Sequence, residues 1–201
     1  MPHPSSERHP RRSSVETKAR IIDAAQAAFA SRGYAQSVLT EIAERAEVTG
    51  PLIIRYFGSK EGLFEEAFAQ CLASMPMLTS EPPEFGRVAI ELMTGGHVPT
   101  MRASAMLAHS IGDSRAREIA RRLIKQHLLV PLGERMDDPD GDARAELILM
   151  LGVGYATMRM VVPPEPTQNG HADFLTEWLA DALQSIVDRP RVGRRVERRA
   201  A

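Results

Sequence analysis

Hydrogen-bonding side chains gather between residues 37 and 60, in the segment SVLTEIAERAEVTGPLIIRYFGSK. Near the end of this segment, Arg55 is able to make a bidentate contact with the edge of a guanine base. The same guanidinium could instead hold a phosphate, and both roles stay open because phosphate contacts outnumber base contacts in protein–DNA complexes. The side chains therefore suggest recognition of a nucleic acid, provided that the backbone presents Arg55 on an exposed helix.

The segment is predicted to fold as two short helices joined by a tight turn at residues 46–48. The first helix has one apolar face, formed at helical spacing by Leu39, Ile42, Ala43 and Ala46. Ser37 is its expected N-cap, and Thr49 is the expected N-cap of the second helix. Pro51 then lies in the first turn, where a missing N–H costs nothing, and the helix runs to about Tyr56. Two helices joined in this way form a helix-turn-helix unit, whose second helix enters the DNA major groove.

Residues from Thr17 to about Phe68 resemble the tetracycline-repressor-like (TetR) family of transcriptional regulators. The resemblance is carried by several motifs in unbroken register: IIDAA at 21–25, Phe29, RGY at 32–34, IAERA at 42–46, Val48-Thr49, RYFGSKE at 55–61 and Leu63. It implies an all-α fold, with an N-terminal three-helix helix-turn-helix DNA-binding domain and a C-terminal helical domain that binds a ligand and dimerises.

Position and resemblance together give a predicted set of DNA-binding residues: Ser37, Thr40, Thr49, Gly50, Pro51, Leu52, Arg55, Tyr56 and Lys60. By position, the residues that face outward or forward on the second helix are Thr49, Gly50, Pro51, Leu52 and Arg55. Thr40, Tyr56 and Lys60 are carried over from the family as phosphate contacts. Ser37 could serve as a helix cap alone.

Two positions depart from the family pattern. Glu47 stands where the turn usually has Gly, which suits a tight turn because Gly adopts positive φ without a steric penalty. Ile54 stands where the recognition helix usually has Tyr, and an aliphatic side chain has no hydrogen bond to donate to a phosphate.

Composition and charge divide the chain into four segments: a disordered basic arm at 1–14, the DNA-binding domain at 15–76, the helical ligand-binding and dimerisation domain at 77–188, and a basic disordered tail at 189–201. The net charge is +3 for residues 1–60, −9 for 61–188 and +5 for 189–201. A polyanionic partner is therefore expected to meet the two ends. The arm and the tail could each contact DNA or could each be a solvated terminus.

Apolar periodicity predicts the remaining helices. In the first domain they are Thr17–Ser31, stopped by Gly33, and a helix that begins after the N-cap Ser59 and ends by Pro76. In the second domain the predicted helices are Phe85–Thr94, Thr100–Ile111, Ser114–Arg135 with a bend near Pro131, Ala143–Val161 and Phe174–Val187.

The second domain is expected to hold a ligand pocket, and the candidate residues are Met93, Met101, His109 and His127. Methionine adapts to irregular apolar ligands, although methionine at helical spacing is more often ordinary core. The two histidines could line a polar corner. They do not predict a metal site, because no His pair has a spacing of three or four residues and no Cys joins them.

The last two helices carry more apolar surface than one face needs, which suggests a partner surface. The predicted dimer interface contains Leu151, Gly152, Tyr155, Ala156, Leu175, Trp178, Leu179 and Leu183. The alternative is that these two helices simply bury each other. We favour a homodimer because a two-fold DNA site needs two recognition helices about 34 Å apart.

The sequence also argues against several classes of protein. It has no G-x-S-x-G elbow, no phosphate-binding Gly loop and no H-E-x-x-H motif, so we expect neither an enzyme nor a cofactor. No apolar run is long enough to predict a membrane helix, and the N-terminus does not resemble a secretory signal. A single cysteine, Cys71, fits a reducing compartment, and we expect a cytoplasmic protein.

The function that these observations predict is a homodimeric repressor that binds a palindromic operator and is released by a small apolar effector. Two alternatives stay open. One is a helical small-molecule-binding or scaffold dimer whose helix-turn-helix no longer recognises sequence, and the other is a TetR-like activator.

Overall fold

The computed structural model describes residues 10–162 and 171–188, and every regular element within these ranges is helical. The α-helices are α1 (Pro10–Gln36), α2 (Leu39–Arg45), α3 (Gly50–Phe57), α4 (Lys60–Ala73), α5 (Phe85–Thr94), α6 (Val98–Ser110), α7 (Ser114–Ile124), α8 (Val130–Arg135), α9 (Gly141–Val161) and α10 (His171–Asp188). Short 3₁₀ turns at Pro76–Leu78 and Pro82–Glu84 join α4 to α5. The structure thus confirms the predicted all-α fold.

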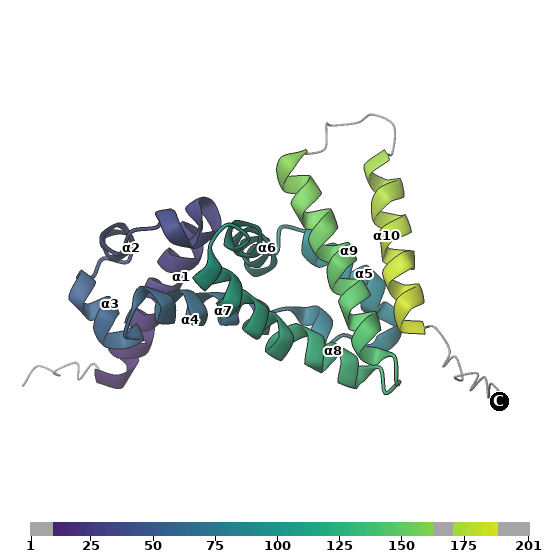
Figure 1. Cartoon of the computed structure of the whole chain (residues 1–201), viewed down its shortest axis with the longest axis horizontal. Coiled ribbons are helices and arrows are strands. Elements are labelled where there is room, and N and C mark those ends of the chain that lie inside the picture. Colours follow the sequence, from purple (N-terminus) through teal and green to yellow (C-terminus); the bar gives the residue numbers. More distant parts are fainter. Residues whose placement is uncertain (1–9, 163–170, 189–201) are drawn as a thin grey trace, which may run out of the picture.

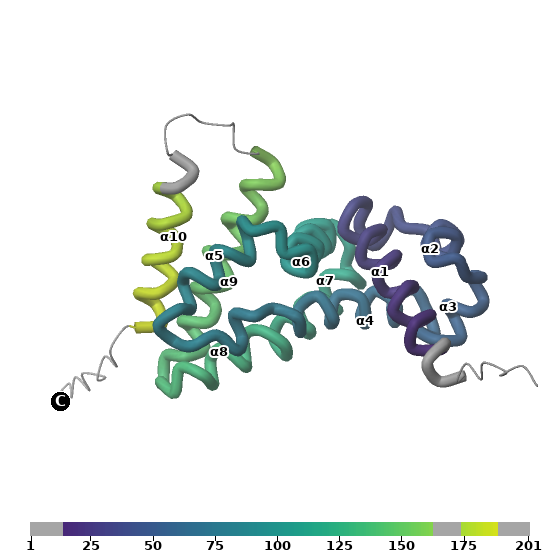
Figure 2. Tube along the Cα trace, turned by 180° about the vertical axis from the view of Figure 1, so that it is seen from behind, coloured from purple at the N-terminus to yellow at the C-terminus, as the bar shows by residue number. Residues whose placement is uncertain are grey.

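The helices form an elongated molecule with α1–α4 at one end and α9 and α10 at the other (Figure 1). Helix α6 lies between the two ends and packs against α1, while α4 packs against α6 and α7. Helices α9 and α10 run side by side in opposite directions, and their connected ends extend beyond the rest of the molecule in both views (Figure 2). The inner side of α10 packs against α5.

An aromatic cluster forms the core of the first domain. The Phe64 ring lies edge-on to Phe29, with 5.1 Å between the ring centroids, and edge-on to Tyr34 at 5.4 Å. Ile21 of α1 and Ile53 of α3 are also completely buried. Edge-to-face contacts of this kind add to the free energy gained by burying the rings. The cluster therefore fixes α1, α3 and α4 relative to one another.

Several predicted boundaries are confirmed. Helix α5 has the predicted limits Phe85–Thr94. The Ser59 hydroxyl caps α4 by accepting a hydrogen bond from the Gly62 N–H at 3.1 Å. Gly33 interrupts α1 with a φ of 77°, a left-handed value that glycine adopts without a steric penalty.

Other boundaries differ from the prediction. Helix α1 begins at Pro10 rather than near Thr17, so residues 10–14 are helical and do not belong to a disordered arm. Proline is well tolerated at the start of a helix, because its missing N–H would have no intrahelical partner there. The predicted behaviour of residues 1–9, of the 163–170 loop and of the 189–201 tail lies outside the described residues.

The predicted helix Ser114–Arg135 is divided in three. A π-helical turn at Lys125–Leu129 separates α7 from α8, and the Val130 N–H bonds to the carbonyl of Lys125. Pro131, next in the chain, has no N–H to donate and its ring crowds the preceding turn. The widened turn accommodates the proline at the place where the sequence predicted a bend.

Ion pairs tie the two domains together. Within the described residues, three of them join arginines of the second domain to carboxylates of the first: Arg102–Asp23 at 2.6 Å, Arg115–Glu61 at 2.9 Å and Arg122–Glu65 at 2.8 Å. Pairs this exposed contribute little free energy each, roughly 0–1 kcal/mol. Their positions on α6 and α7 nevertheless help to set the angle at which the two domains meet.

The turn before α3 contains the strained residue that the sequence predicted. Glu47 has a φ of 54°, in the left-handed region that side chains other than glycine rarely adopt. Its carboxylate accepts a hydrogen bond from the Arg20 guanidinium at 3.2 Å, and both side chains are largely exposed. The exposed pair offsets only part of the conformational cost, so the turn is held mainly by the packing on either side of it.

We expect Glu47→Gly to raise the free energy of unfolding by roughly 0.5–1 kcal/mol, because glycine adopts positive φ without the Cβ clash. Glu47→Gln is the matched control, since it removes the charge and keeps the strained φ. Urea denaturation of both variants measures the difference. A glycine variant no more stable than the glutamine variant would show that φ at this position carries no strain.

Candidate nucleic-acid interface and cavity

Helix α3 presents one face to solvent. Ile53 is completely buried, while Pro51 and Arg55, four residues apart, lie on the opposite side and are exposed. Thr49 occupies the N-cap position as predicted, although its side chain makes no capping hydrogen bond. Gly58 ends the helix with a φ of 76°. Buried Ile53 therefore fixes the rotation of α3, and that rotation points Arg55 outward.

The other predicted contact residues surround this face. Thr40, Thr49, Pro51 and Arg55 are exposed, and Gly50, Leu52, Tyr56 and Lys60 are half-buried. The Lys60 ammonium lies 4.6 Å from the Tyr34 ring centroid and 3.4 Å from the carbonyl oxygen of Ala35, to which it donates. The Tyr56 hydroxyl lies 3.1 Å from that of Ser14. The hydroxyl, ammonium and guanidinium groups thus come from α2, α3 and the start of α4, which are consecutive helices of the first domain.

Ser37 differs from these residues. Its side chain is buried, and its hydroxyl donates a 2.7 Å hydrogen bond to the carbonyl oxygen of Gly33. The N-cap position of α2 is occupied by Val38, which has no side-chain hydrogen bond to give. The prediction that Ser37 caps α2 is therefore wrong, because Val38 holds the N-cap position and the Ser37 hydroxyl bonds back to a carbonyl four residues earlier. Its burial argues against the predicted contact with DNA.

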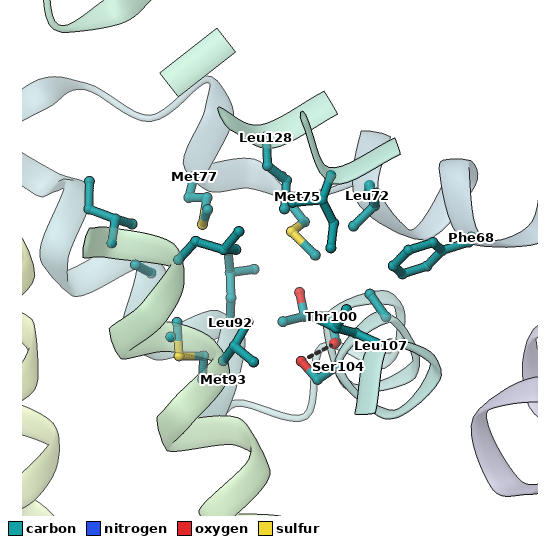
Figure 3. Close-up of a pocket in the computed structure, with 17 residues that line it drawn as sticks. Phe68, Leu72, Met75, Met77, Leu92, Met93, Thr100, Ser104, Leu107 and Leu128 are labelled. Carbon is teal, nitrogen blue, oxygen red and sulfur yellow. Dashed lines mark hydrogen bonds between the residues drawn. The ribbon is translucent and has the colours of Figure 1, made fainter. Parts of the chain in front are cut away.

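The second domain contains a cavity between α4, α5, α6 and α9, which we call the inner cavity (Figure 3). Its lining atoms border about 590 Å³ of empty space, which includes open solvent, and the room for the centres of water-sized molecules is about 50 Å³. Most lining side chains are apolar, among them Phe68, Leu72, Met75, Met77 and Leu107. Thr100 and Ser104 add hydroxyl groups, and the Ser104 hydroxyl donates to the carbonyl oxygen of Thr100 at 3.0 Å.

The predicted ligand-binding residues are only partly located at cavities. Met93 lines the inner cavity, and both Met93 and Met101 line a second opening beside it. His109 and His127 line neither of these spaces. His109 packs against Gly33, where an added Cβ would lie 3.0 Å from the His109 Cβ, so it belongs to the joint between the domains. The sequence did offer one overlooked signal, the hydroxyl pair Thr100 and Ser104 one helical turn apart on an apolar helix.

The predicted dimer residues fall into two groups, one accessible to solvent and one buried. Leu175 and Trp178 are exposed, and Leu151, Tyr155 and Ala156 are half-buried. Gly152, Leu179 and Leu183, by contrast, are buried inside the protomer. A Cβ on Gly152 would lie 2.8 Å from the Met93 methyl group, so this glycine allows α5 rather than a second copy to approach α9.

An exposed apolar stripe runs along α9, beside the predicted dimer residues. It consists of Leu147, Met150, Gly154, Met158 and Val161, which recur at the spacing of one helix face. On α10 the exposed apolar residues are Phe174, Leu175 and Trp178. We call these residues together the α9–α10 face.

Comparison with known proteins identifies the fold. The family model described as "Tetracyclin repressor-like, C-terminal domain" matches residues 84–187, and the model "Bacterial regulatory proteins, tetR family" matches residues 21–67. The chain belongs to the TetR family of transcriptional regulators. TetR-family chains combine an N-terminal DNA-binding helix-turn-helix with a C-terminal ligand-binding domain, which are here α1–α4 and the helices that follow.

Solved TetR-like structures resemble most of the chain. A TetR-family regulator from Rhodococcus sp. is 16% identical, covers 87% of this chain and 97% of its own, and has a TM-score of 0.67. The fatty acid degradation regulator FadR from Bacillus halodurans is 16% identical, with coverages of 85% and 94% and a TM-score of 0.60. The multidrug binding protein EbrR complexed with imidazole is 20% identical, with coverages of 94% and 99% and a TM-score of 0.59. At these identities the structures establish a shared fold.

A curated relative of a different kind also matches. It is the tRNA N6-adenosine threonylcarbamoyltransferase of Herminiimonas arsenicoxydans, 32% identical over 125 residues. The match spans 56% of this chain but only 30% of the length of that enzyme. Within the described residues of the TetR-family chain, no cluster of three or more His, Cys, Asp or Glu side chains is suited to hold a metal ion. No described helix is long and apolar enough to cross a membrane.

We expect Ser37→Ala to lower the free energy of unfolding by about 1 kcal/mol, because it removes a buried hydrogen bond, and to leave DNA affinity unchanged. Thr40→Ala is the matched control: its exposed side chain should matter little for stability and more for DNA. Urea denaturation and fluorescence anisotropy with labelled duplex measure the two quantities. Weaker DNA binding by Ser37→Ala at unchanged stability would return Ser37 to the contact surface.

Proposed function

We propose that the protein represses transcription by binding a palindromic operator as a homodimer, and that a small molecule in the second domain releases it. The observation that carries this proposal is the orientation of α3, which is fixed by buried Ile53 so that Pro51 and Arg55 face solvent. Within the described residues Arg55 forms no ion pair or side-chain hydrogen bond, so its guanidinium is free to bind an external acceptor. The protein would act in the cytoplasm by binding, without a catalytic step or a cofactor.

The contact residues divide into two roles. Thr49, Gly50, Pro51, Leu52 and Arg55 belong to the exposed or leading part of α3, which would enter the major groove. Leu52 and Pro51 can offer apolar contact to a thymine methyl group, and Arg55 can bind a guanine edge or a phosphate. Thr40, Tyr56 and Lys60 flank the helix and would position it through phosphates.

Dimerisation through the α9–α10 face is supported by the solvent exposure of its large apolar side chains. Met150, Met158 and Trp178 are 64%, 59% and 59% exposed, which is costly for large apolar side chains that have no partner. The face lies at the end of the molecule away from α3 (Figure 1). A two-fold axis there would relate two copies of α3, as a palindromic site requires.

Control by a small molecule is supported by the inner cavity. It is enclosed mainly by apolar side chains, three of them the flexible methionines Met75, Met77 and Met93. A solved relative, EbrR, is described as a multidrug binding protein and was solved with imidazole. A ligand releases DNA only if it binds the non-binding arrangement of the dimer more tightly than the DNA-bound one.

We expect Arg55→Ala to weaken binding to the preferred operator by roughly 1–3 kcal/mol. If Arg55 contacts a base, the variant loses its preference at one base pair of each half-site. If Arg55 contacts a phosphate, affinity falls uniformly and its salt dependence becomes shallower. Anisotropy titrations with the operator and its single-base variants separate the two roles.

The control for that experiment is Arg121→Ala, which removes an exposed arginine on α7 that pairs with Glu118. It should bind the operator as the native protein does. Unchanged affinity in Arg55→Ala would contradict the proposed orientation of α3 on DNA.

We expect Met158→Glu to weaken the dimer more than about a hundredfold, because the two-fold axis brings two carboxylates into one apolar interface. The protomer should keep its fold, since Met158 is already exposed. Sedimentation equilibrium measures the dimer, and circular dichroism checks the fold. Ile111→Glu, at an exposed site outside the α9–α10 face, is the matched control, and equal dimerisation of the two variants would place the interface elsewhere.

A further inference from the structure

A second cavity opens beside the inner one, between α1, α6 and α9, and we call it the outer cavity. It borders about 1200 Å³ of empty space, part of which is open to solvent. Three arginines line it, Arg45 at the end of α2, Arg102 on α6 and Arg159 on α9. No aspartate or glutamate is among its described lining residues. The outer cavity is therefore a positively charged space where the two domains meet.

The two cavities are adjacent and share part of their walls. Met93, Thr100 and Ser104 line both of them. Figure 3 shows these side chains at the edge of the inner cavity, with the Met93 thioether beside Leu92 and the two hydroxyl-bearing residues on α6. A flexible thioether and two small hydroxyl side chains form this shared wall, and rotation of Met93 would open it. An apolar space and a cationic space thus adjoin.

The arginines are not fully neutralised by the protein. Arg102 donates to Asp23 at 2.6 Å and to the Gln26 amide oxygen at 3.1 Å. The Arg159 guanidinium lies 5.6 Å from the Tyr155 ring centroid and, within the described residues, forms no ion pair. Arg45 likewise has no described ion-pair partner. Among the described ion pairs, the one carboxylate bound to these three arginines is Asp23, on Arg102, so an anion in the cavity would find unpaired donors on Arg159 and Arg45.

We propose that the effector is an amphipathic carboxylate, with its apolar chain in the inner cavity and its carboxylate between Arg102 and Arg159 in the outer cavity. This inference rests on the proposed function and names the chemical class of its ligand. A neutral apolar molecule would fill the inner cavity but leave the guanidinium groups without a partner. A cation would be repelled by them.

The same geometry connects the ligand to the DNA-binding domain. A carboxylate at Arg102 competes with Asp23, which lies on α1, and so weakens one of the ion pairs that join the domains. Arg45 ends α2, immediately before the turn that leads to α3. An anion that draws Arg45 toward the outer cavity would move that turn. The ligand thereby gains a different free energy of binding in the two arrangements, as release from DNA requires.

Isothermal titration calorimetry with three ten-carbon probes tests the ligand class. We expect decanoate to bind at least about tenfold more tightly than decan-1-ol, because a carboxylate gains charge-assisted hydrogen bonds that the alcohol lacks. Decyltrimethylammonium should bind more weakly than either. Equal affinity for decanoate and decan-1-ol would overturn the proposal, as would absence of binding by every fatty acid from octanoate to tetradecanoate.

The affinity of decanoate for single-residue variants tests where its carboxylate binds. Arg159→Gln should weaken decanoate about tenfold while leaving decan-1-ol unchanged, and Arg159→Lys should restore part of the loss. Asp23→Asn should tighten decanoate, because Arg102 is then free of its internal partner. Arg121→Gln is the control for a lost surface charge. Decanoate affinity unchanged by both Arg159→Gln and Asp23→Asn would overturn the assigned position of the carboxylate.

A parallel titration of the native protein with operator DNA separates this inference from the proposed function. Sequence-specific DNA binding without decanoate binding overturns the ligand class alone. Decanoate binding without sequence-specific DNA binding supports the ligand class and contradicts the regulator.

Discussion

The packing of α6 against α1 is the contact on which both proposed activities, DNA binding and its control by a ligand, depend. One side of α6 carries Thr100 and Ser104, which line the cavities. Another side carries Arg102, which bonds to Asp23 of α1, and His109, which packs against the kink at Gly33. A rigid helix that forms a cavity wall and also contacts the DNA-binding domain can transmit a change in either place to the other, provided that it has two stable positions.

The local structure of the first domain could be predicted because its signals lie close together in the sequence. Thr49, Pro51 and Ser59 mark helix ends, and the structure places the helix boundaries beside them. Glu47 adopts the positive φ that its place in a tight turn implied. Ser37 was misassigned as a cap because its hydroxyl bonds back to the carbonyl of Gly33, four residues earlier, and cap propensity does not distinguish such a bond from a cap.

The second domain could be predicted as helices but not as a site. Its inner cavity is assembled from α4, α5, α6 and α9, so no single stretch of sequence contains its pattern. The exposure of the predicted dimer residues was only half-predicted for a related reason. Periodicity indicated that α10 has apolar residues around much of its circumference, but it could not tell Leu183, which packs inside the protomer, from Trp178, which is exposed. Which face a helix turns toward its own chain is decided by long-range packing.

Selection of bound fragments from the source genome at near-physiological salt, followed by sequencing, tests most directly whether α3 recognises sequence as one half of a two-fold dimer. We predict one shared palindrome, with half-site centres about one helical turn of DNA, or a multiple of it, apart. Fragments retained without a common site, with affinity that falls steeply as salt rises, would contradict this, since that behaviour is typical of backbone contacts alone.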